Sequence, residues 1–172
     1  GGSIENRCRL LFEVLDAVSK AVGPGKCAVR LSPHAPGTKI YSDCTNPNPD
    51  ALYEYAIKGI NQFPLAYLLL TEPRWDSSRD DMVENDPGFN MPVVNGPKFR
   101  QHYQGTLILA GGFTPKSAQE AVESGMCDAI AFGRWFISNP DLPARLKNGI
   151  PLNRYNRKTF YAYSNVGYTD YP

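Results

Sequence analysis

The stretch from Leu107 to Arg134 constrains the fold more than any other, because it has the pattern strand, glycine turn, helix, strand, glycine turn. Its first apolar run, Thr106 to Ala110, is short and branched, which is typical of a strand buried on both faces of a parallel sheet. Thr114-Pro115 opens a helical period that ends at Gly125. The alternation predicts an α/β fold with a parallel sheet.

Both predicted strands are followed directly by glycine. Gly111 and Gly112 follow the first strand, and Gly133 and Arg134 follow the second. Glycine lets the backbone approach a ligand and present its N–H groups, and arginine adds a guanidinium. This is how a phosphate site is built across the last two βα loops of a (β/α)₈ barrel. The alternative is that each turn is an ordinary tight turn, but two such turns with an arginine favour phosphate.

The rest of the chain continues the same alternation. Strands are expected near residues 26, 65, 106 and 128, after a leading helix and before an aromatic tail that starts at Pro151. Four βα units are half of a (β/α)₈ barrel, which takes about 250 residues. We therefore expect one partial domain over residues 1–172, either a piece of a longer protein or half of an assembly, with its tail docked against the barrel.

Capping signals and apolar spacing place the helices. Ser3 is an expected N-cap for a leading helix with this apolar stripe: Ile4, Cys8, Leu11, Leu15, Val18 and Val22. Asn48-Pro49 starts a second helix, residues 96–103 form a short third, and Asn139-Pro140-Asp141 precedes another.

Composition excludes several classes of function. The formal net charge of +1 argues against nucleic acid or an anionic membrane as the main partner. No apolar run approaches the roughly 20 residues that span a bilayer, so membrane insertion is not expected. The four cysteines and two histidines lack metal-ligand spacing, so no metal site is expected. Cys8 and Cys27 lie in apolar patterns, which predicts buried free thiols and a reducing compartment such as the cytoplasm or an organelle interior.

Three further features are candidate site elements. Arg30 interrupts an apolar strand, where a charge costs several kcal/mol unless a carboxylate or a ligand compensates it. His34 follows in a loop, where a solvated side chain is the default and ligand contact the alternative. Residues 76–92 are polar, acidic and too long for a neutral connection, which favours a lid or a substrate-facing segment.

Motifs along the whole chain resemble the Old Yellow Enzyme flavoproteins, especially the plant oxophytodienoate-reductase branch. They occur in the family's order and are jointly specific: Gly1-Gly2-Ser3-Ile4-Glu5-Asn6-Arg7, Arg30-Leu31-Ser32-Pro33, Thr71-Glu72-Pro73-Arg74, Ala110-Gly111-Gly112-Phe113, Phe132-Gly133-Arg134, Ser138-Asn139-Pro140-Asp141-Leu142, Pro151-Leu152-Asn153-Arg154-Tyr155-Asn156-Arg157 and Gly167-Tyr168-Thr169-Asp170-Tyr171-Pro172.

The resemblance implies the C-terminal half of a (β/α)₈ barrel that holds FMN, is reduced by NADPH or NADH, and reduces the C=C bond of small α,β-unsaturated carbonyl compounds. Arg30 is similar to the family's arginine beside the flavin N1 and O2 edge, which would stabilise the reduced flavin. The glycines of both turns and Arg134 resemble the FMN phosphate cradle. Tyr161 resembles an aromatic near flavin and substrate, and Trp75 lies where a loop residue shapes the substrate pocket.

The family's substrate-anchoring His/His or His/Asn pair and its tyrosine proton donor precede the motif that begins at Gly1, and His34 and His102 do not match them. We therefore expect no catalytic residue in this chain, and an ene-reductase only together with a missing N-terminal half-barrel or a partner chain. The alternatives are a non-catalytic half-barrel that serves as a structural subunit of a larger assembly, and another phosphate-binding barrel enzyme.

Overall fold

The computed structural model describes residues 1–34, 48–74 and 92–172, and divides into two compact units, Gly1–Ile130 and Ala131–Pro172. Each unit is described by itself. The expectation of one partial domain over residues 1–172 stays a prediction. Trp75 and most of the predicted lid lie outside the described residues.

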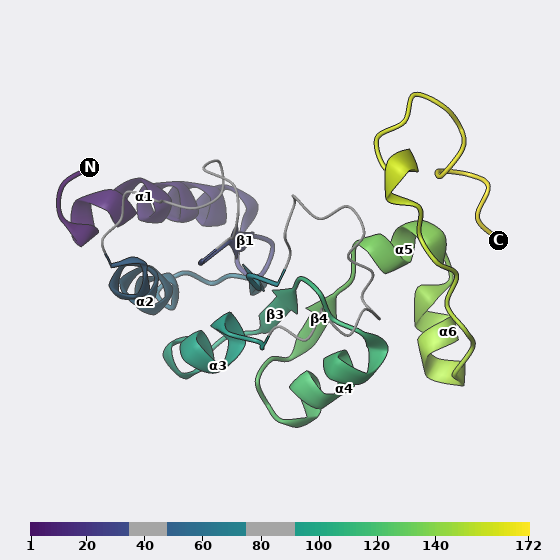
Figure 1. Cartoon of the computed structure of the whole chain (residues 1–172). Coiled ribbons are helices and arrows are strands. Elements are labelled where there is room, and N and C mark those ends of the chain that lie inside the picture. The colour runs from purple at the N-terminus through teal and green to yellow at the C-terminus, as the bar shows by residue number, and fades with distance from the viewer. Residues whose placement is uncertain (35–47, 75–91) are drawn as a thin grey trace. The chain divides into compact units, whose positions relative to one another are not determined.

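The first unit alternates helices with strands, as the sequence pattern predicts (Figure 1). Its elements are α1 (Ile4–Val22), β1 (Ala28–Leu31), α2 (Pro49–Ile60), β2 (Tyr67–Thr71), α3 (Asn95–Phe99) with a 3-10 turn over Arg100–His102, β3 (Leu107–Ala110), α4 (Pro115–Glu123) and the start of β4 (Ala129–Ala131). The predicted caps are confirmed: the side chains of Ser3, Asn48 and Thr114 accept hydrogen bonds from backbone N–H groups in the first turns of α1, α2 and α4.

The strands form one sheet in the order β1-β2-β3-β4. Strands β1 and β2 run parallel, with Arg30 paired with Leu69, and β2 runs parallel to β3. Parallel strands bring their carboxyl ends to the same edge of the sheet. The residues that follow β1, β2 and β3 therefore lie along that edge.

The two faces of the sheet differ in burial. One face contributes four fully buried leucines to the core: Leu68, Leu70, Leu107 and Leu109. Helix α3 covers this face, because Gly96 packs against the Leu109 side chain. The opposite face carries Ala28, Arg30 and Tyr67, which are exposed. In β3, the strand predicted to be buried on both faces, Leu107 and Leu109 are buried, whereas Ile108 and Ala110 on the second face are only half-buried.

Helix α1 also differs from its predicted packing. Cys8 and Leu15 are buried as expected, but Val18 and Val22 are exposed and Ser19 is buried instead. Val18 lies about 80° around the helix from Cys8, outside the face that packs on α2. An exposed apolar stripe with a spacing of four results: Leu10, Val14, Val18 and Val22.

The second unit contains α5 (Arg134–Ser138), α6 (Leu142–Asn148), a 3-10 turn over Arg157–Thr159 and the irregular tail. The sequence pattern did not predict α5. Helix α6 begins after Asp141, so Pro140 precedes the cap, and Pro143 is the proline of the first turn. Gly149 ends α6 in the left-handed conformation, as its position predicts.

Candidate functional site

The turn after β3 is built from two glycines with positive φ angles, 109° at Gly111 and 65° at Gly112. A Cβ at Gly111 would lie 2.9 Å from the backbone oxygen of Glu72. Only glycine therefore fits this turn without strain. Thr114 and Ser117 then form a reciprocal capping box that starts α4.

Glu72, which directly follows β2, anchors the sheet edge. Its side chain is 1% exposed, and the carboxylate accepts hydrogen bonds from three successive backbone N–H groups. Val94 and Asn95 donate to Oε2 at 2.7 and 2.9 Å, and Gly96 donates to Oε1 at 2.8 Å. These are the N–H groups at the start of α3, where an anion is favoured. A buried carboxylate thus finds its partners in the backbone.

Asn95 ties the end of β2 to the turn that follows β1. Its buried side-chain amide donates to the backbone oxygens of Pro33 and Thr71, at 3.0 and 2.8 Å. The Glu72 backbone N–H donates to the oxygen of Ala110 at 2.7 Å. The carboxyl ends of β1, β2 and β3 are therefore held together by hydrogen bonds, which makes this edge a rigid platform.

Arg30 lies on this platform but is exposed, which corrects the expectation of a charge buried inside a strand. Its Nε donates to the Thr71 hydroxyl at 3.0 Å. The side chain therefore needs no buried carboxylate, because it leaves the strand on the uncovered face. The hydroxyl fixes the inner part of the guanidinium, so the side chain is oriented at the carboxyl ends of the strands.

Arg74 and Phe113 lie beside the same glycine turn. The Arg74 guanidinium carbon is 5.0 Å from the centroid of the Phe113 ring, within cation–π range. Both side chains are buried. No role was predicted for Arg74, although it belongs to the Thr71-Glu72-Pro73-Arg74 motif. An arginine packed on the residue that follows Gly112 stiffens the turn from one side.

In the second unit, Gly133 and Arg134 begin α5. Gly133 has a φ of −100°, and a Cβ there would meet no atom of the described residues within 4 Å. Arg134 Nη1 donates to the Tyr155 hydroxyl at 3.2 Å, and the guanidinium carbon lies 5.5 Å from the centroid of the same ring. Gly111 and Gly112 belong to the first unit, so their action with Gly133 and Arg134 on one phosphate stays a prediction.

Among the remaining candidates, Tyr161 is 92% exposed in the tail, so its place in a substrate pocket stays a prediction. His34 has a positive φ of 55°, and its Nε2 lies 2.6 Å from Asp50 Oδ1. The ammonium of Lys98, 2.6 Å from Asp50 Oδ2, holds the pKa of Asp50 below its usual range, and His34 adds to the effect. Among the described residues, His34 thus contacts a carboxylate.

The three cysteines in the described part of the chain are buried. Cys8, Cys27 and Cys127 are buried free thiols, as predicted for the first two. Burial raises the pKa of Cys127 to about 11, which keeps it protonated near neutral pH. Over residues 1–34, 48–74 and 92–172, three or more His, Cys, Asp or Glu residues nowhere gather as metal ligands would. In the same ranges, no helix combines the length and apolar character needed to cross a bilayer.

Sequence reasoning missed the residues that hold the two arginines and the platform: Thr71, Glu72, Asn95 and Tyr155. The sequence did contain a signal for Glu72. An acidic side chain directly after an apolar strand and before a proline is unexpected unless hydrogen-bond donors compensate its charge. Tyr155 had none, because only folding brings it to Arg134, 21 positions earlier in the chain.

Comparison with known proteins agrees with these observations. The chain is 42% identical over its whole length to 12-oxophytodienoate reductase 2 of Arabidopsis thaliana, of which it covers 43%. It is 43% identical to putative 12-oxophytodienoate reductase 11 of Oryza sativa subsp. japonica, of which it covers 44%. The chain therefore spans less than half the length of these curated relatives.

Solved structures give the same result for the fold. The whole chain superposes on morphinone reductase in complex with tetrahydroNAD with a TM-score of 0.79 at 38% identity, covering 42% of that chain. With the old yellow enzyme homologue from Zymomonas mobilis the TM-score is 0.82 at 33% identity, covering 45% of that chain. Both are (β/α)₈ barrels, so this α/β chain corresponds to part of such a barrel, as the count of strands predicted.

A family model described as NADH:flavin oxidoreductase / NADH oxidase matches residues 1–153, which include both glycine turns and both arginines. The match covers most of the chain. The chain belongs to the NADH:flavin oxidoreductase / NADH oxidase family, within its Old Yellow Enzyme and 12-oxophytodienoate reductase-like members.

Proposed function

We propose that the protein that contains this chain is an FMN-dependent NAD(P)H ene-reductase of α,β-unsaturated carbonyl compounds. In this proposal the chain supplies the flavin-phosphate end of the site. The observation that carries it is that Arg30 and Arg134, each directly in or after a strand, are both oriented by a hydroxyl group. Each oriented guanidinium group suits an anionic group of a ligand.

The residues fit FMN chemically. Its phosphate requires hydrogen-bond donors and positive charge, which Arg134 and the backbone of the glycine turns offer. Gly133 fits such a role, because the space beside its Cα is open to a ligand atom. Bound FMN would supply the hydride chemistry between the nicotinamide and the substrate.

The chain's own residues would then act by binding and by electrostatics. Arg30 would favour the anionic form of the reduced ring system, because a fixed positive charge stabilises developing negative charge. Arg134 would retain the cofactor by its phosphate. Trp75 and Tyr161 would border the substrate. No described residue is assigned to polarise the carbonyl or to protonate the substrate, and these tasks are proposed to belong to the other half of the barrel.

The exposed surfaces support a protein partner for this chain. Strand β1 is at the edge of the sheet, and none of the described residues pairs with its outer side. Helix α1 exposes the apolar stripe that runs from Leu10 to Val22. Unpaired strand edges and apolar stripes are covered in stable proteins. We propose that a complementary half-barrel, from the same polypeptide or from another chain, covers both.

The same surfaces favour a second candidate function. A half-barrel without catalytic residues could serve as a structural subunit that is capped by a larger assembly. The intact mass of the native polypeptide, measured with its visible absorbance spectrum, decides between the two. A mass near twice 19.1 kDa with a flavin spectrum supports the ene-reductase. A mass near 19.1 kDa without flavin contradicts it and favours the structural subunit.

The phosphate assignment has its own test. Replacing Arg134 by alanine should weaken FMN binding by about 1.5–3 kcal/mol, or one to two decades in Kd, because a charge-assisted contact is lost. Riboflavin lacks the phosphate, so its Kd should not change. Titration of the apoprotein by flavin fluorescence measures both. An unchanged Kd for FMN would show that Arg134 does not bind the phosphate.

A further inference from the structure

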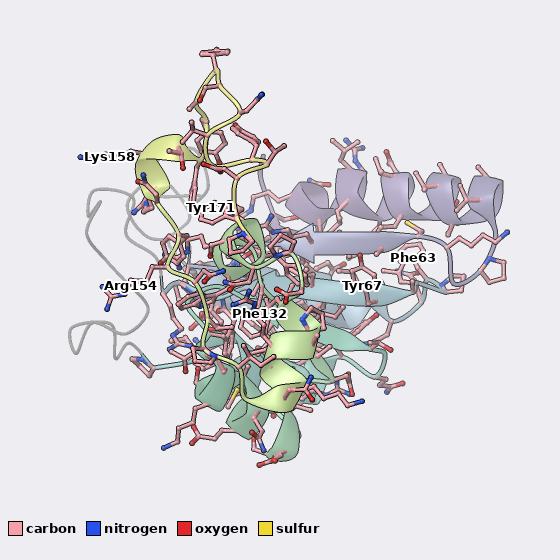
Figure 2. All side chains as sticks on the ribbon, turned by 90° about the vertical axis from the view of Figure 1, so that its right-hand side faces the viewer. Phe63, Tyr67, Phe132, Arg154, Lys158 and Tyr171 are labelled. Carbon is pink, nitrogen blue, oxygen red and sulfur yellow. The ribbon has the colours of Figure 1, made fainter. Side chains whose placement is uncertain are left out.

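The Arg134 guanidinium contacts both the ring and the hydroxyl of Tyr155. Arg154 and Lys158 project away from the ribbon of the tail (Figure 2) and are exposed. The Arg134 guanidinium instead lies against Tyr155. An arginine side chain loses rotamer entropy when a ligand fixes it, so orientation before binding has a measurable effect.

Tyr155 contacts Arg134 in two ways. The ring lies 5.5 Å from the guanidinium carbon, within the distance at which an aromatic face attracts a cation. The hydroxyl accepts a hydrogen bond from Nη1 at 3.2 Å. A ring contact limits the tilt of the guanidinium plane, and a hydrogen bond limits its rotation within that plane. Together the contacts restrict the direction in which the side chain presents its N–H groups.

Tyr155 is itself held by neighbouring aromatic rings. Trp135 packs against it edge-on, with centroids 5.4 Å apart and an interplanar angle of 75°. Phe160 packs against it at 5.6 Å. Edge-to-face and tilted pairs at these distances are favourable. Tyr155 is therefore a fixed contact for Arg134.

A buried hydrogen-bond network holds the backbone on either side of this cluster. The Asn153 carbonyl accepts from the Ser138 hydroxyl at 2.9 Å and from the Asn139 amide at 3.1 Å. The Asn153 backbone N–H donates to the Asn139 side-chain oxygen at 2.8 Å. Ser138 ends α5, which begins at Arg134, and Asn153 precedes Tyr155 by two positions. The network thus fixes both segments that carry the Arg134–Tyr155 pair.

We propose that Tyr155 is a positioning residue that orients the Arg134 guanidinium for the cofactor phosphate. The proposal rests on the proposed function, because it assumes that Arg134 binds the FMN phosphate. Tyr155 acts through Arg134 and contacts no reacting atom. Its removal should therefore weaken recognition of the phosphate and leave recognition of the flavin ring unchanged.

The experiment compares FMN with riboflavin on the apoprotein of the complete native protein. Tyr155→Phe keeps the ring and removes the hydroxyl, and should raise the Kd for FMN by about three- to tenfold. The Kd for riboflavin should stay the same. Tyr155→Leu removes both contacts and should have the larger effect on FMN. Tyr168→Phe is the matched control, because it removes another tail hydroxyl, which donates to the Phe160 carbonyl at 2.9 Å.

A double-mutant cycle decides whether Tyr155 acts through Arg134. In the Arg134→Ala background, Tyr155→Phe should have no further effect on FMN binding. An additive effect, an equal change for both flavins, or no change for FMN would overturn the positioning role.

If Arg134→Ala alone leaves the Kd for FMN unchanged, the phosphate assignment fails as well. If Arg134→Ala weakens FMN binding and Tyr155→Phe does not, only the role of Tyr155 fails. If Tyr155→Leu does not fold, the Kd values of Tyr155→Phe alone decide the test.

Discussion

After β3 the chain turns through Gly111 and Gly112 with positive φ angles, whereas after β4 it passes through Gly133 with a φ of −100°. At Gly111 a Cβ would lie 2.9 Å from a backbone oxygen, and at Gly133 it would meet no atom of the described residues within 4 Å. The fold itself thus requires glycine in the first turn. In the second turn the described residues leave room for a larger side chain, so they do not by themselves require glycine.

The two turns also differ in what holds them. The first lies beside Glu72, whose carboxylate binds three backbone N–H groups, and beside the buried pair Arg74 and Phe113. The second begins a short helix and presents an arginine that contacts Tyr155. A turn that the fold requires contributes to stability, and one that the fold does not require is free to serve a ligand. The comparison predicts stability effects at the first turn and binding effects at the second.

The largest stability effect is expected at Glu72. Glu72→Gln replaces one carboxylate oxygen by an NH2 group, which donates and cannot accept, so at least one buried N–H group at the start of α3 loses its partner. We expect a loss of about 3 kcal/mol in the free energy of unfolding, measured by urea denaturation. Glu54→Gln is the control, since Glu54 makes an exposed pair with Lys58 and its loss should change stability far less. Equal losses in the two variants would contradict the anchoring role.

Three glycine-to-alanine variants separate conformational strain from steric contact. Gly111→Ala combines a positive φ with a close contact and should lose about 2–3 kcal/mol. Gly125 has a φ of 74° with open space, so Gly125→Ala should lose about 1 kcal/mol. Gly133→Ala has neither and should stay within about 0.5 kcal/mol of the original chain. Urea denaturation measures all three. A large loss at Gly133 would break the comparison of the two turns.

The contact between Thr71 and Arg30 can be tested in the same way as the contact between Tyr155 and Arg134. Thr71→Val removes the hydroxyl that accepts from Arg30, while Thr71→Ser keeps it. In the flavin-loaded protein the Val variant should lower the flavin midpoint potential, because a displaced Arg30 stabilises the reduced anion less, by about 1 kcal/mol. Spectroelectrochemical titration measures the potential. A potential that is equal in the Val and Ser variants would show that Thr71 does not position Arg30.

A small, pH-dependent effect is expected at the Asp50 pair. Because the pKa of Asp50 is lowered in the folded chain, its contribution to stability is present above the ordinary value of 3.8. That contribution is lost as the pH falls through the lower, folded pKa. Lys98→Met should reduce stability by at most about 1 kcal/mol at pH 6, and the difference should vanish at strongly acidic pH. Lys116→Met, which removes an exposed pair with Glu120, is the control for urea midpoints between pH 2 and pH 6.

Local signals in the sequence predicted most of the fold. The capping residues Ser3, Asn48 and Thr114 and the spacing of apolar residues located the main helices of the first unit. Short apolar runs located the strands to within about two residues. The pattern missed α5 because Arg134 to Ser138 makes only five residues of helix, too few for an apolar period to be visible.

The sequence alone identified Arg30, Arg134 and the glycines as candidates, because charge and backbone freedom are properties of the residue type. Tertiary structure decided what each of them does. Folding places Thr71 beside Arg30 and Tyr155 beside Arg134, over separations of 41 and 21 residues. It also decided that Gly111 is obligatory and Gly133 is not, since the approach of Glu72 to Gly111 comes from the pairing of β2 with β3. Contacts between distant segments follow from packing, and no local pattern records them.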